Sequence, residues 1–412
     1  MPRFTNLKAF ACASLERFTK GVRATSPGMS RPMASRAEGD LMLACLRGDP
    51  LLDLVRCGID WTAFRETAAW HGVLPLAYWR LNADCPDEVP SEVTTQLRNA
   101  FRETAGRNLL FASELSIVLE MFRRKRIRAV PLKGPALAFG MYENYALREF
   151  EDLDILVQRS QAREAMDLLA SGGYAPAIQL RGAVAASYIN TNYEMVFRRP
   201  GGPCPVEIHW GLQEEKFLSA ALGPEHWWRR METIQIAGSA VVIPSRADLL
   251  LFLCAHGAKH RWERLKWICD ISALIRSSPG LDWSAICEEA ADKGVERLLW
   301  LGLLLAKQVV NCPLPEKVER SALVEPGIER LAARICRRLY AEPRRAGLFE
   351  TTIFHLALKK RFGEKLRYVS KNMFVPTAGE WSTVTLPAYL TGLYYVLRPL
   401  RLLKDVLGRK QR

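Results

Sequence analysis

Residues 130–157 read VPLKGPALAFGMYENYALREFEDLDILV, and this stretch decides the fold that we expect for the chain. It begins with a short apolar run, turns at Lys133-Gly134, continues as one helical segment and ends on an apolar strand that carries Asp152 and Asp154. Because side chains alternate along a strand, the two aspartates should project from one face while the apolar residues point into a core. The pattern predicts the start of an α/β core.

The pair of aspartates indicates a metal site. Two carboxylates held side by side repel each other unless a cation lies between them. We expect Mg²⁺, because carboxylate oxygens suit this hard cation and its slow dehydration leaves room for substrate phosphates. A solvated pair at the start of a strand gives the same pattern, so Asp-x-Asp alone leaves both interpretations open.

The residues before the aspartates have the properties of a phosphate site. Gly134 lies where a strand gives way to a helix, so the backbone can approach a phosphate closely and the helix N-terminal amides can face it. Lys133 adds a point charge. Arg148, four residues before Asp152, adds a planar fork for phosphate oxygens.

These motifs resemble a known family, the uncharacterised nucleotidyltransferase-like proteins of the polymerase-beta-type nucleotidyltransferase superfamily. The family pattern is a Leu-Lys-Gly start, an Arg shortly before an Asp-x-Asp pair, and an acid in a later Glu-x-His-Trp strand. In this sequence the matching residues are Leu132-Lys133-Gly134, Arg148, Asp152-Leu153-Asp154 and Glu207-Ile208-His209-Trp210. The likeness continues through residues 255–260 and 397–401, so it covers most of the chain from about residue 40.

The resemblance implies a metal-dependent nucleotidyltransferase. Asp152, Asp154 and Glu207 would hold two magnesium ions, and a nucleoside triphosphate would donate its nucleotidyl group to a hydroxyl acceptor. Glu207 and His209 share a face of a predicted strand, which meets the aspartates if the two strands are neighbours. Glu207 could then assist deprotonation of the acceptor, and His209 could contact Glu207 or the nucleotide. The acceptor stays open, with a protein, sugar or other small molecule favoured over nucleic acid.

Departures from the wider superfamily support a second hypothesis, an inactive nucleotide-binding scaffold of a biosynthetic or membrane-associated assembly. Pro135 stands where the superfamily has a hydroxyl or a second glycine, the connection from Gly134 to Asp152 is long, and the third acid is Glu207 instead of Asp. Proline suits a first helical turn but removes one phosphate donor.

A second helical region begins at Ser245, where Ser-x-x-Asp is a capping box. His256 and His260 follow its buried stripe, and without an evident third ligand we interpret them, with Lys259, as polar packing residues or as contacts to phosphate or substrate. Further on, Lys266 and Asp270 have the spacing of a helix-surface ion pair.

Composition is that of an ordinary globular protein, with 412 residues, 49% hydrophobic and 25% charged. The net charge of +14 suits nucleotide, nucleic acid or anionic lipid without separating them. Ten cysteines without a Cys-x-x-Cys pair argue against zinc knuckles and disulfide frameworks and favour a reducing cytoplasm. No apolar run reaches the length of about 18 residues that a membrane-spanning helix needs.

The expected fold class is α+β: a small mixed sheet in an α/β nucleotidyltransferase core, flanked by helical N-terminal and C-terminal regions. The predicted segments are a disordered or basic extension (1–36), a helical region (37–126), the core (127–244), a helical domain (245–375) and a basic amphipathic segment (376–412). The last segment either docks as a helix on the bundle or lies on an anionic membrane surface. A peripheral membrane contact of a cytoplasmic protein is therefore left open.

Overall fold

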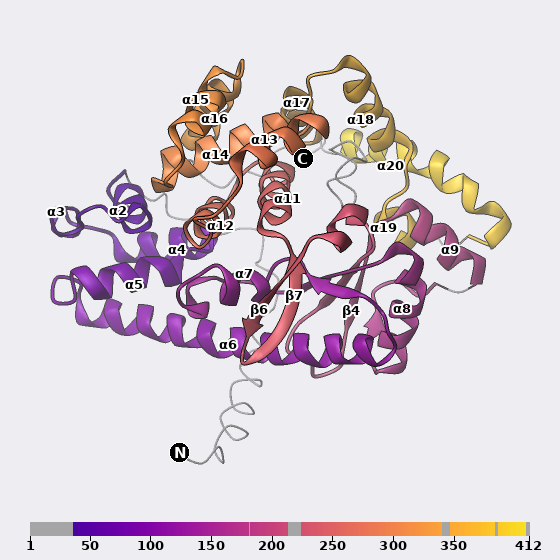
Figure 1. The fold of residues 1–412 in the computed structure, drawn as a ribbon, viewed down its shortest axis with the longest axis horizontal. Helices are drawn as coiled ribbons and strands as arrows, with labels where there is room; N and C mark the ends of the chain where they lie inside the picture. The colour runs from indigo at the N-terminus through magenta and orange to yellow at the C-terminus, as the bar shows by residue number, and fades with distance from the viewer. Residues whose placement is uncertain (1–35, 181, 213–223, 340–346, 384–385, 409–412) are drawn as a thin grey trace, which may run out of the picture. The chain divides into compact units, whose positions relative to one another are not determined.

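A five-stranded mixed sheet organises the chain, as the α+β prediction requires (Figure 1). In the computed structural model the described residues are 36–180, 182–212, 224–339, 347–383 and 386–408, so nearly all of the predicted 1–36 extension lies outside them. The sheet has the order β1-β2-β5-β4-β3, and its strands are β1 (Ala129–Pro131), β2 (Leu153–Val157), β3 (Ala175–Pro176), β4 (Glu194–Arg198) and β5 (Val206–His209).

The pairing of the strands confirms the expectation on which the site depends. β2 and β5 are parallel neighbours, while the β1–β2, β4–β5 and β3–β4 pairs are antiparallel. In the β2–β5 register Asp154 lies opposite Glu207. Every residue of β2 is buried, as expected for a strand that is covered on both faces. A separate hairpin is formed by β6 (Met231–Ile236) and β7 (Ser239–Pro244).

The predicted N-terminal helical region is present. Its longest helix, α6, carries an apolar stripe at the helical spacing of the sequence, with Leu115, Val118 and Phe122 buried and Leu119 half-buried, and ends at Arg124. Arg123 and Arg124 pair with Glu120 at that end, which agrees with a solvated helix terminus. The helices are α2 (Arg36–Arg47), α3 (Leu52–Val55), α4 (Trp61–His71), α5 (Leu74–Asp84) and α6 (Ser91–Arg124).

One prediction for the 130–157 stretch is wrong, because the residues after Gly134 do not form one continuous helix. α7 (Pro135–Gly140) is short, and the chain restarts as a 3₁₀ turn, η1 (Tyr145–Leu147). The side chain of Asn144 accepts a hydrogen bond from the Ala146 amide, which caps the new turn. Side-chain competition of this kind interrupts a helix that periodicity alone would continue.

Later elements follow the predicted order. α8 (Ala162–Ser171) stops at Gly172, and α9 (Gly182–Thr191) leads into β4. The 3₁₀ turns η2 (Arg159–Gln161) and η4 (Pro224–Arg229) precede α8 and β6. The second helical region comprises α11 (Arg246–Lys259), α12 (Leu265–Arg276), α13 (Trp283–Asp292), α14 (Glu296–Val310), α15 (Glu316–Val324), α16 (Ile328–Leu339), α17 (Leu348–Ala357) and α18 (Phe362–Phe374). The predicted 376–412 segment contains α19 (Ala378–Thr383), the 3₁₀ turn η5 (Ala388–Leu393) and α20 (Tyr394–Gly408).

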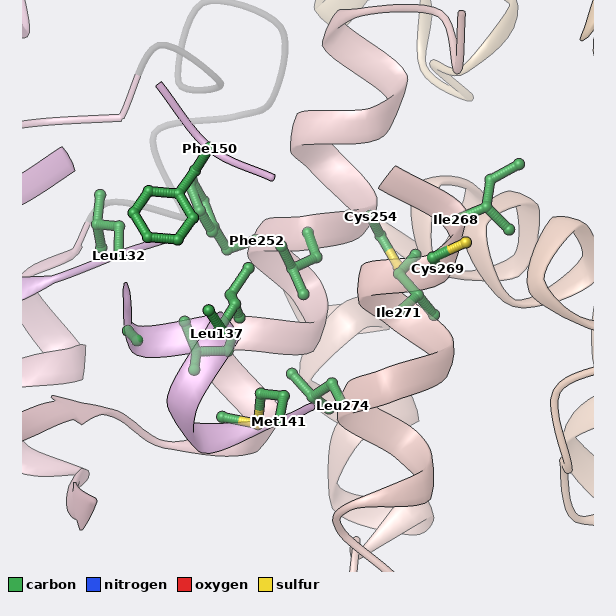
Figure 2. Close-up of a cluster of buried hydrophobic side chains, with 14 of the residues drawn as sticks. Leu132, Leu137, Met141, Phe150, Phe252, Cys254, Ile268, Cys269, Ile271 and Leu274 are labelled. Atoms are coloured by element: carbon green, nitrogen blue, oxygen red, sulfur yellow. The ribbon is translucent and has the colours of Figure 1, made fainter. Parts of the chain in front are cut away.

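The sheet-side segments and the second helical region share one core. Figure 2 shows Leu137 and Met141, from α7 and its end, in the same apolar cluster as Phe252 of α11 and Leu274 of α12. Residues 34–412 accordingly form one compact unit. The predicted segment boundaries within it stay predictions. Within the described ranges, none of the helices combines the length and the apolar character needed to cross a bilayer.

Candidate active site

Asp154, Glu207 and His209 converge on one face of the β2–β5 pair, with Asp154 and Glu207 each one residue after the start of its strand. One ligand atom from each of the three lies within 4.8 Å of the others. The parallel register between Asp154 and Glu207 produces this cluster, and His209 follows Glu207 by two residues on β5. The Nε2 of His209 lies 3.8 Å from a carboxylate oxygen of Glu207, so the predicted shared face of these two residues is present.

Asp154 is a buried carboxylate with strong local compensation for one of its oxygens. The Nζ of Lys133 lies 3.1 Å from Oδ1, and the Nε2 of His209 donates to the same oxygen at 3.1 Å. Although burial favours the neutral acid, Lys133 and His209 hold the pKa of Asp154 well below its usual range. Its Oδ2 is buried and has no hydrogen-bond partner among the described residues.

The pKa values of the neighbouring acids, Glu207 and Asp152, are shifted in the opposite direction. Burial, reinforced by the charge of Asp154, raises the pKa of Glu207 to about 7. The same two causes raise the pKa of Asp152 above its usual value. Without an added cation, burial and mutual repulsion therefore disfavour the full ionisation of these three carboxylates.

His209 acts as an internal cation of this cluster. Burial lowers its pKa, but the hydrogen bond to Asp154 and the charge of Glu194 outweigh that effect and raise it. Its Nδ1 lies 3.4 Å from a carboxylate oxygen of Glu194, which stands opposite His209 in the β4–β5 register. An imidazolium that faces carboxylates from both ring nitrogens is the form that these contacts favour.

Asp152 lines the same pocket but lies outside the group of three converging ligand atoms. β2 begins at Leu153, so Asp152 belongs to the preceding bend and strand alternation does not fix its side chain. The structure thus places Asp154 with Glu207 directly and Asp152 beside them, which differs from the expected pair on one strand face.

The backbone of Gly134 lies close to the segment that carries Asp152 and Asp154. Its φ of +58° and ψ of −121° suit glycine, and a Cβ there would lie 3.3 Å from the carbonyl oxygen of Asp152. The close approach seen here is therefore to the backbone of Asp152. α7 has only six residues and begins at Pro135, which lacks an N–H, so the start of this helix offers few backbone donors to the pocket.

The second helical region supplies the opposite wall of the pocket. His256, Lys259 and His260 from α11 line it together with Lys266 and Trp267 of α12, around a volume of about 270 Å³. The His260 ring stacks on Trp267 with centroids 4.8 Å apart. Burial, with the nearby charge of Lys133, lowers the pKa of His256 well below its usual value.

Arg148 also lines this pocket, but most of its guanidinium is engaged by Asp270. Its Nε and Nη2 donate to the two oxygens of Asp270 at 2.7 and 2.9 Å, and the hydroxyl of Tyr142 donates to Oδ1 at 2.8 Å. The predicted surface pair of Lys266 and Asp270 is wrong: Asp270 is 1% exposed, and a carboxylate so buried requires a matched cation. The Nη1 of Arg148 is buried without a partner among the described residues.

The sequence profile of the family described as uncharacterised nucleotidyltransferase matches residues 58–311. The chain belongs to this family. The match runs from just before α4 to the end of α14, so it contains both walls of the pocket. No curated protein and no solved structure matches the chain. Membership identifies a nucleotidyltransferase in general terms, with a nucleoside triphosphate as substrate.

Nucleotidyltransferases typically use divalent metals, and the residues present in this family member fit such an ion. The carboxylates of Asp154 and Glu207 lie within coordination range of one another, and Asp152 lines the same pocket. The partnerless Oδ2 of Asp154 provides a buried acceptor, and a cation beside Glu207 would offset the burial and the charge of Asp154 that raise its pKa.

Sequence reasoning about this nucleotidyltransferase missed four charged groups at the pocket: Glu194, Glu149, Glu151 and Arg264. Glu194 could have been found, because residues 193–198 and 205–210 flank the turn at Gly201-Gly202, as in a hairpin, and the β4–β5 register sets Glu194 opposite His209. Glu149 and Arg264 lie outside regular elements, and no periodic signal points to them.

Proposed function

We propose that the protein moves a nucleoside monophosphate from a nucleoside triphosphate to a hydroxyl acceptor in a magnesium-dependent reaction. The observation that carries the proposal is the register of Asp154 with Glu207 on parallel neighbouring strands, beside a buried carboxylate oxygen without a partner. Family membership supports the reaction class.

Asp154, Glu207 and the adjacent Asp152 would hold the magnesium, for which we expect two ions. Bound magnesium would neutralise the phosphates and stabilise charge on the attacking and leaving oxygens. With it in place the three carboxylates need no protons, because a cation favours their ionised forms.

Lysines of both walls would hold the triphosphate. Lys133 on one wall and Lys259 on the other line the same pocket, and Lys266 lies on the same side as Lys259. Burial lowers the pKa of Lys266, and a phosphate beside it would favour its charged form. His256 and His260 would contact the phosphates or the acceptor from α11.

The transfer step forms one bond and breaks one bond at the α-phosphorus, and a residue of the pocket takes the proton that is released. The acceptor oxygen forms a bond to the α-phosphorus, the bond from that phosphorus to the pyrophosphate oxygen breaks, and pyrophosphate leaves. Glu207, whose carboxylate lines the pocket, accepts the proton of the acceptor hydroxyl. Arg148 is held in place by Asp270, and its Nη1 has no other partner among the described residues, so it would donate to a phosphate oxygen.

A second candidate, an inactive nucleotide-binding scaffold, is favoured by two observations. Pro135 removes an amide at the start of α7, and Lys133 and His209 already compensate Oδ1 of Asp154. The protein would then bind the magnesium nucleotide without turnover. In either role we place it in the cytoplasm, since the described cysteines are all free.

The deciding experiment is incubation of the full chain with each α-labelled triphosphate, magnesium and cell extract, followed by mass identification of labelled products. We expect transfer by the wild type and a loss of at least about 100-fold in Asp154→Asn and Glu207→Gln. Asp167→Asn, at an exposed carboxylate of α8, is the matched control and should keep full activity. Equal transfer by wild type and Asp154→Asn would refute the proposal; nucleotide binding without any labelled product would establish the scaffold.

A further inference from the structure

Two helices near the C-terminus carry apolar stripes that the fold leaves uncovered. On α18, Phe362, Leu366, Val369 and Met373 recur at helical spacing and are between 37% and 80% exposed. On α20, Val396, Leu400 and Leu403 recur in the same way and are 56–57% exposed. Isolated apolar residues on a surface are ordinary, whereas exposed stripes on two contacting helices mark an interaction surface.

The opposite side of each helix is anchored to the body of the protein. Tyr368 of α18 is buried and donates its hydroxyl to Nδ1 of His355 at 2.8 Å. His355 in turn hydrogen-bonds through Nε2 to the carbonyl of Ala258 on α11, the helix that forms a wall of the nucleotide pocket. Tyr394 of α20 is buried against Trp381, with ring centroids 3.9 Å apart. The exposed stripes are therefore not needed for docking the helices.

The charge of this region selects the kind of partner. Residues 359–412 contain twelve Lys and Arg but only three Asp and Glu. Glu380 is buried and pairs with Arg398 and Arg401, and Lys360 pairs with Glu296 and Glu325, so the positive charge of the surface comes from the remaining lysines and arginines. Arg361 and Arg367 beside the α18 stripe and Lys404 beside the α20 stripe are exposed.

We propose that α18 and α20 form a surface that docks on an anionic lipid membrane, with the two apolar stripes entering the headgroup boundary and the flanking lysines and arginines contacting lipid phosphates. Apolar side chains next to basic ones are what an interfacial helix requires. Figure 1 labels α17, α18 and α20 together, and α18 contacts both of the others.

A second copy of the chain fits this surface less well. Isologous pairing would bring two strongly basic faces together, and like charges at an interface oppose association. A membrane with anionic headgroups satisfies the apolar stripes and the positive charge at once. The inference goes beyond nucleotidyl transfer, since it concerns where the protein works and needs no activity for its test.

Flotation of the full chain with lipid vesicles tests the docking surface. We expect binding to phosphatidylcholine vesicles that contain about 30% phosphatidylglycerol, little binding to pure phosphatidylcholine, and weaker binding as salt rises from about 0.1 to 1 M. The double variant Leu366→Glu/Leu400→Glu should reduce binding at least about tenfold. Both positions are exposed, so the fold should tolerate the change, which circular dichroism checks.

The matched control is Leu323→Glu/Val324→Glu, which places the same two charges on residues that are 44% and 79% exposed at the end of α15, outside the proposed surface. It should bind like the wild type. Absence of wild-type flotation, equal binding to uncharged vesicles, or unchanged binding of the double variant would each overturn the proposal. A concentration-dependent dimer in light scattering that the double variant dissolves would assign the stripes to a second copy and overturn it as well.

Discussion

Two carboxylates one strand apart show how contacts at the scale of single residues decide protonation. Asp154 and Glu207 lie opposite each other in the β2–β5 register. Lys133 and His209 stabilise the charge of Asp154 against the cost of burial, whereas Glu207 faces that charge from a site where burial dominates. The same residue chemistry thus gives one acid that stays ionised and one that titrates near neutral pH.

This difference makes the stability of the metal-free protein depend on pH in a defined direction. The pKa of Glu207 rises from 4.5 to about 7 on folding, so between these values the folded state holds a proton that the unfolded state has lost. The free energy of unfolding must therefore fall as pH rises through that window. Glu207→Gln removes the effect and should be more stable than wild type at pH 8, by about 1–3 kcal/mol, with no difference below the window.

Urea unfolding in the presence of a chelator, at several pH values from about 4 to 8, measures this. Glu164→Gln, the same substitution at an exposed position of α8, should follow the wild-type curve throughout. Equal free energies of unfolding for wild type and Glu207→Gln at pH 8 would contradict the prediction. They would show that ionising the Glu207 carboxylate does not destabilise the folded state.

At the scale of elements, the packing of α11 depends on the residues that follow the helix as much as on its own sequence. Ser245 caps its start through a hydrogen bond from the Asp248 amide. Just after its end, Arg261 and Trp262 adopt positive φ values of 53° and 56°, and the Trp262 ring returns to pack over Gly257. A Cβ at Gly257 would lie 2.3 Å from that ring, so the glycine is required by packing despite its poor helix propensity.

Replacing Gly257 with alanine should therefore destabilise the protein, although alanine is the better helix former. Gly257→Ala should lower the free energy of unfolding by about 1–3 kcal/mol, because the buried Trp262 ring must move. His256 and Lys259 lie beside the site of change, so nucleotide affinity should fall too. Thermal melting and nucleotide titration measure the two effects.

Gly106 in α6 is the matched control, since a Cβ there would meet nothing within 4 Å. Gly106→Ala should raise the free energy of unfolding by about 0.5–1 kcal/mol. A Gly257→Ala variant that gains stability to the same extent would mean that the Trp262 ring does not restrict this position.

At the scale of the whole molecule, one buried ion pair links the sheet-side segments to the second helical region. Arg148 follows η1, Asp270 belongs to α12, and both are almost fully buried. On the other side, Asn108 of α6 donates to the backbone carbonyl of Arg148. The pair thus joins three regions of the chain around the candidate site.

Removing one partner of the Arg148–Asp270 pair should lower the free energy of unfolding much more than replacing both partners with apolar residues. Asp270→Ala leaves the charge of Arg148 buried and uncompensated and should lower the free energy of unfolding by about 3–5 kcal/mol. The double variant Arg148→Met/Asp270→Leu should lose less, although the hydroxyl of Tyr142 then lacks its acceptor. Urea unfolding of the variants gives the coupling between the two sites.

Asp167→Ala, which breaks the exposed Arg163–Asp167 pair on α8, serves as the comparison and should change stability by at most about 0.5 kcal/mol. If Asp270→Ala were as mild as this surface change, the pair would not hold the regions together.

Local patterns determined much of this protein before its structure was known. The α6 stripe, the Ser245 cap and the Gly172 stop all lie where periodicity and capping residues place them. The motifs around Asp154 and Glu207 also sufficed to predict the family that the profile match shows. These features depend on residues a few positions apart, which is the range over which side-chain spacing and backbone preferences act.

Tertiary structure alone decided which charges meet. Asp270 pairs with Arg148, 122 residues away, and not with Lys266 on its own helix, because burial leaves an unmatched carboxylate too costly. Likewise Asp154 meets Glu207 through strand pairing, while its sequence neighbour Asp152 stays outside the cluster. A sequence states which ionisable groups exist, but their partners and pKa values follow from contacts between distant segments and from the water that folding removes.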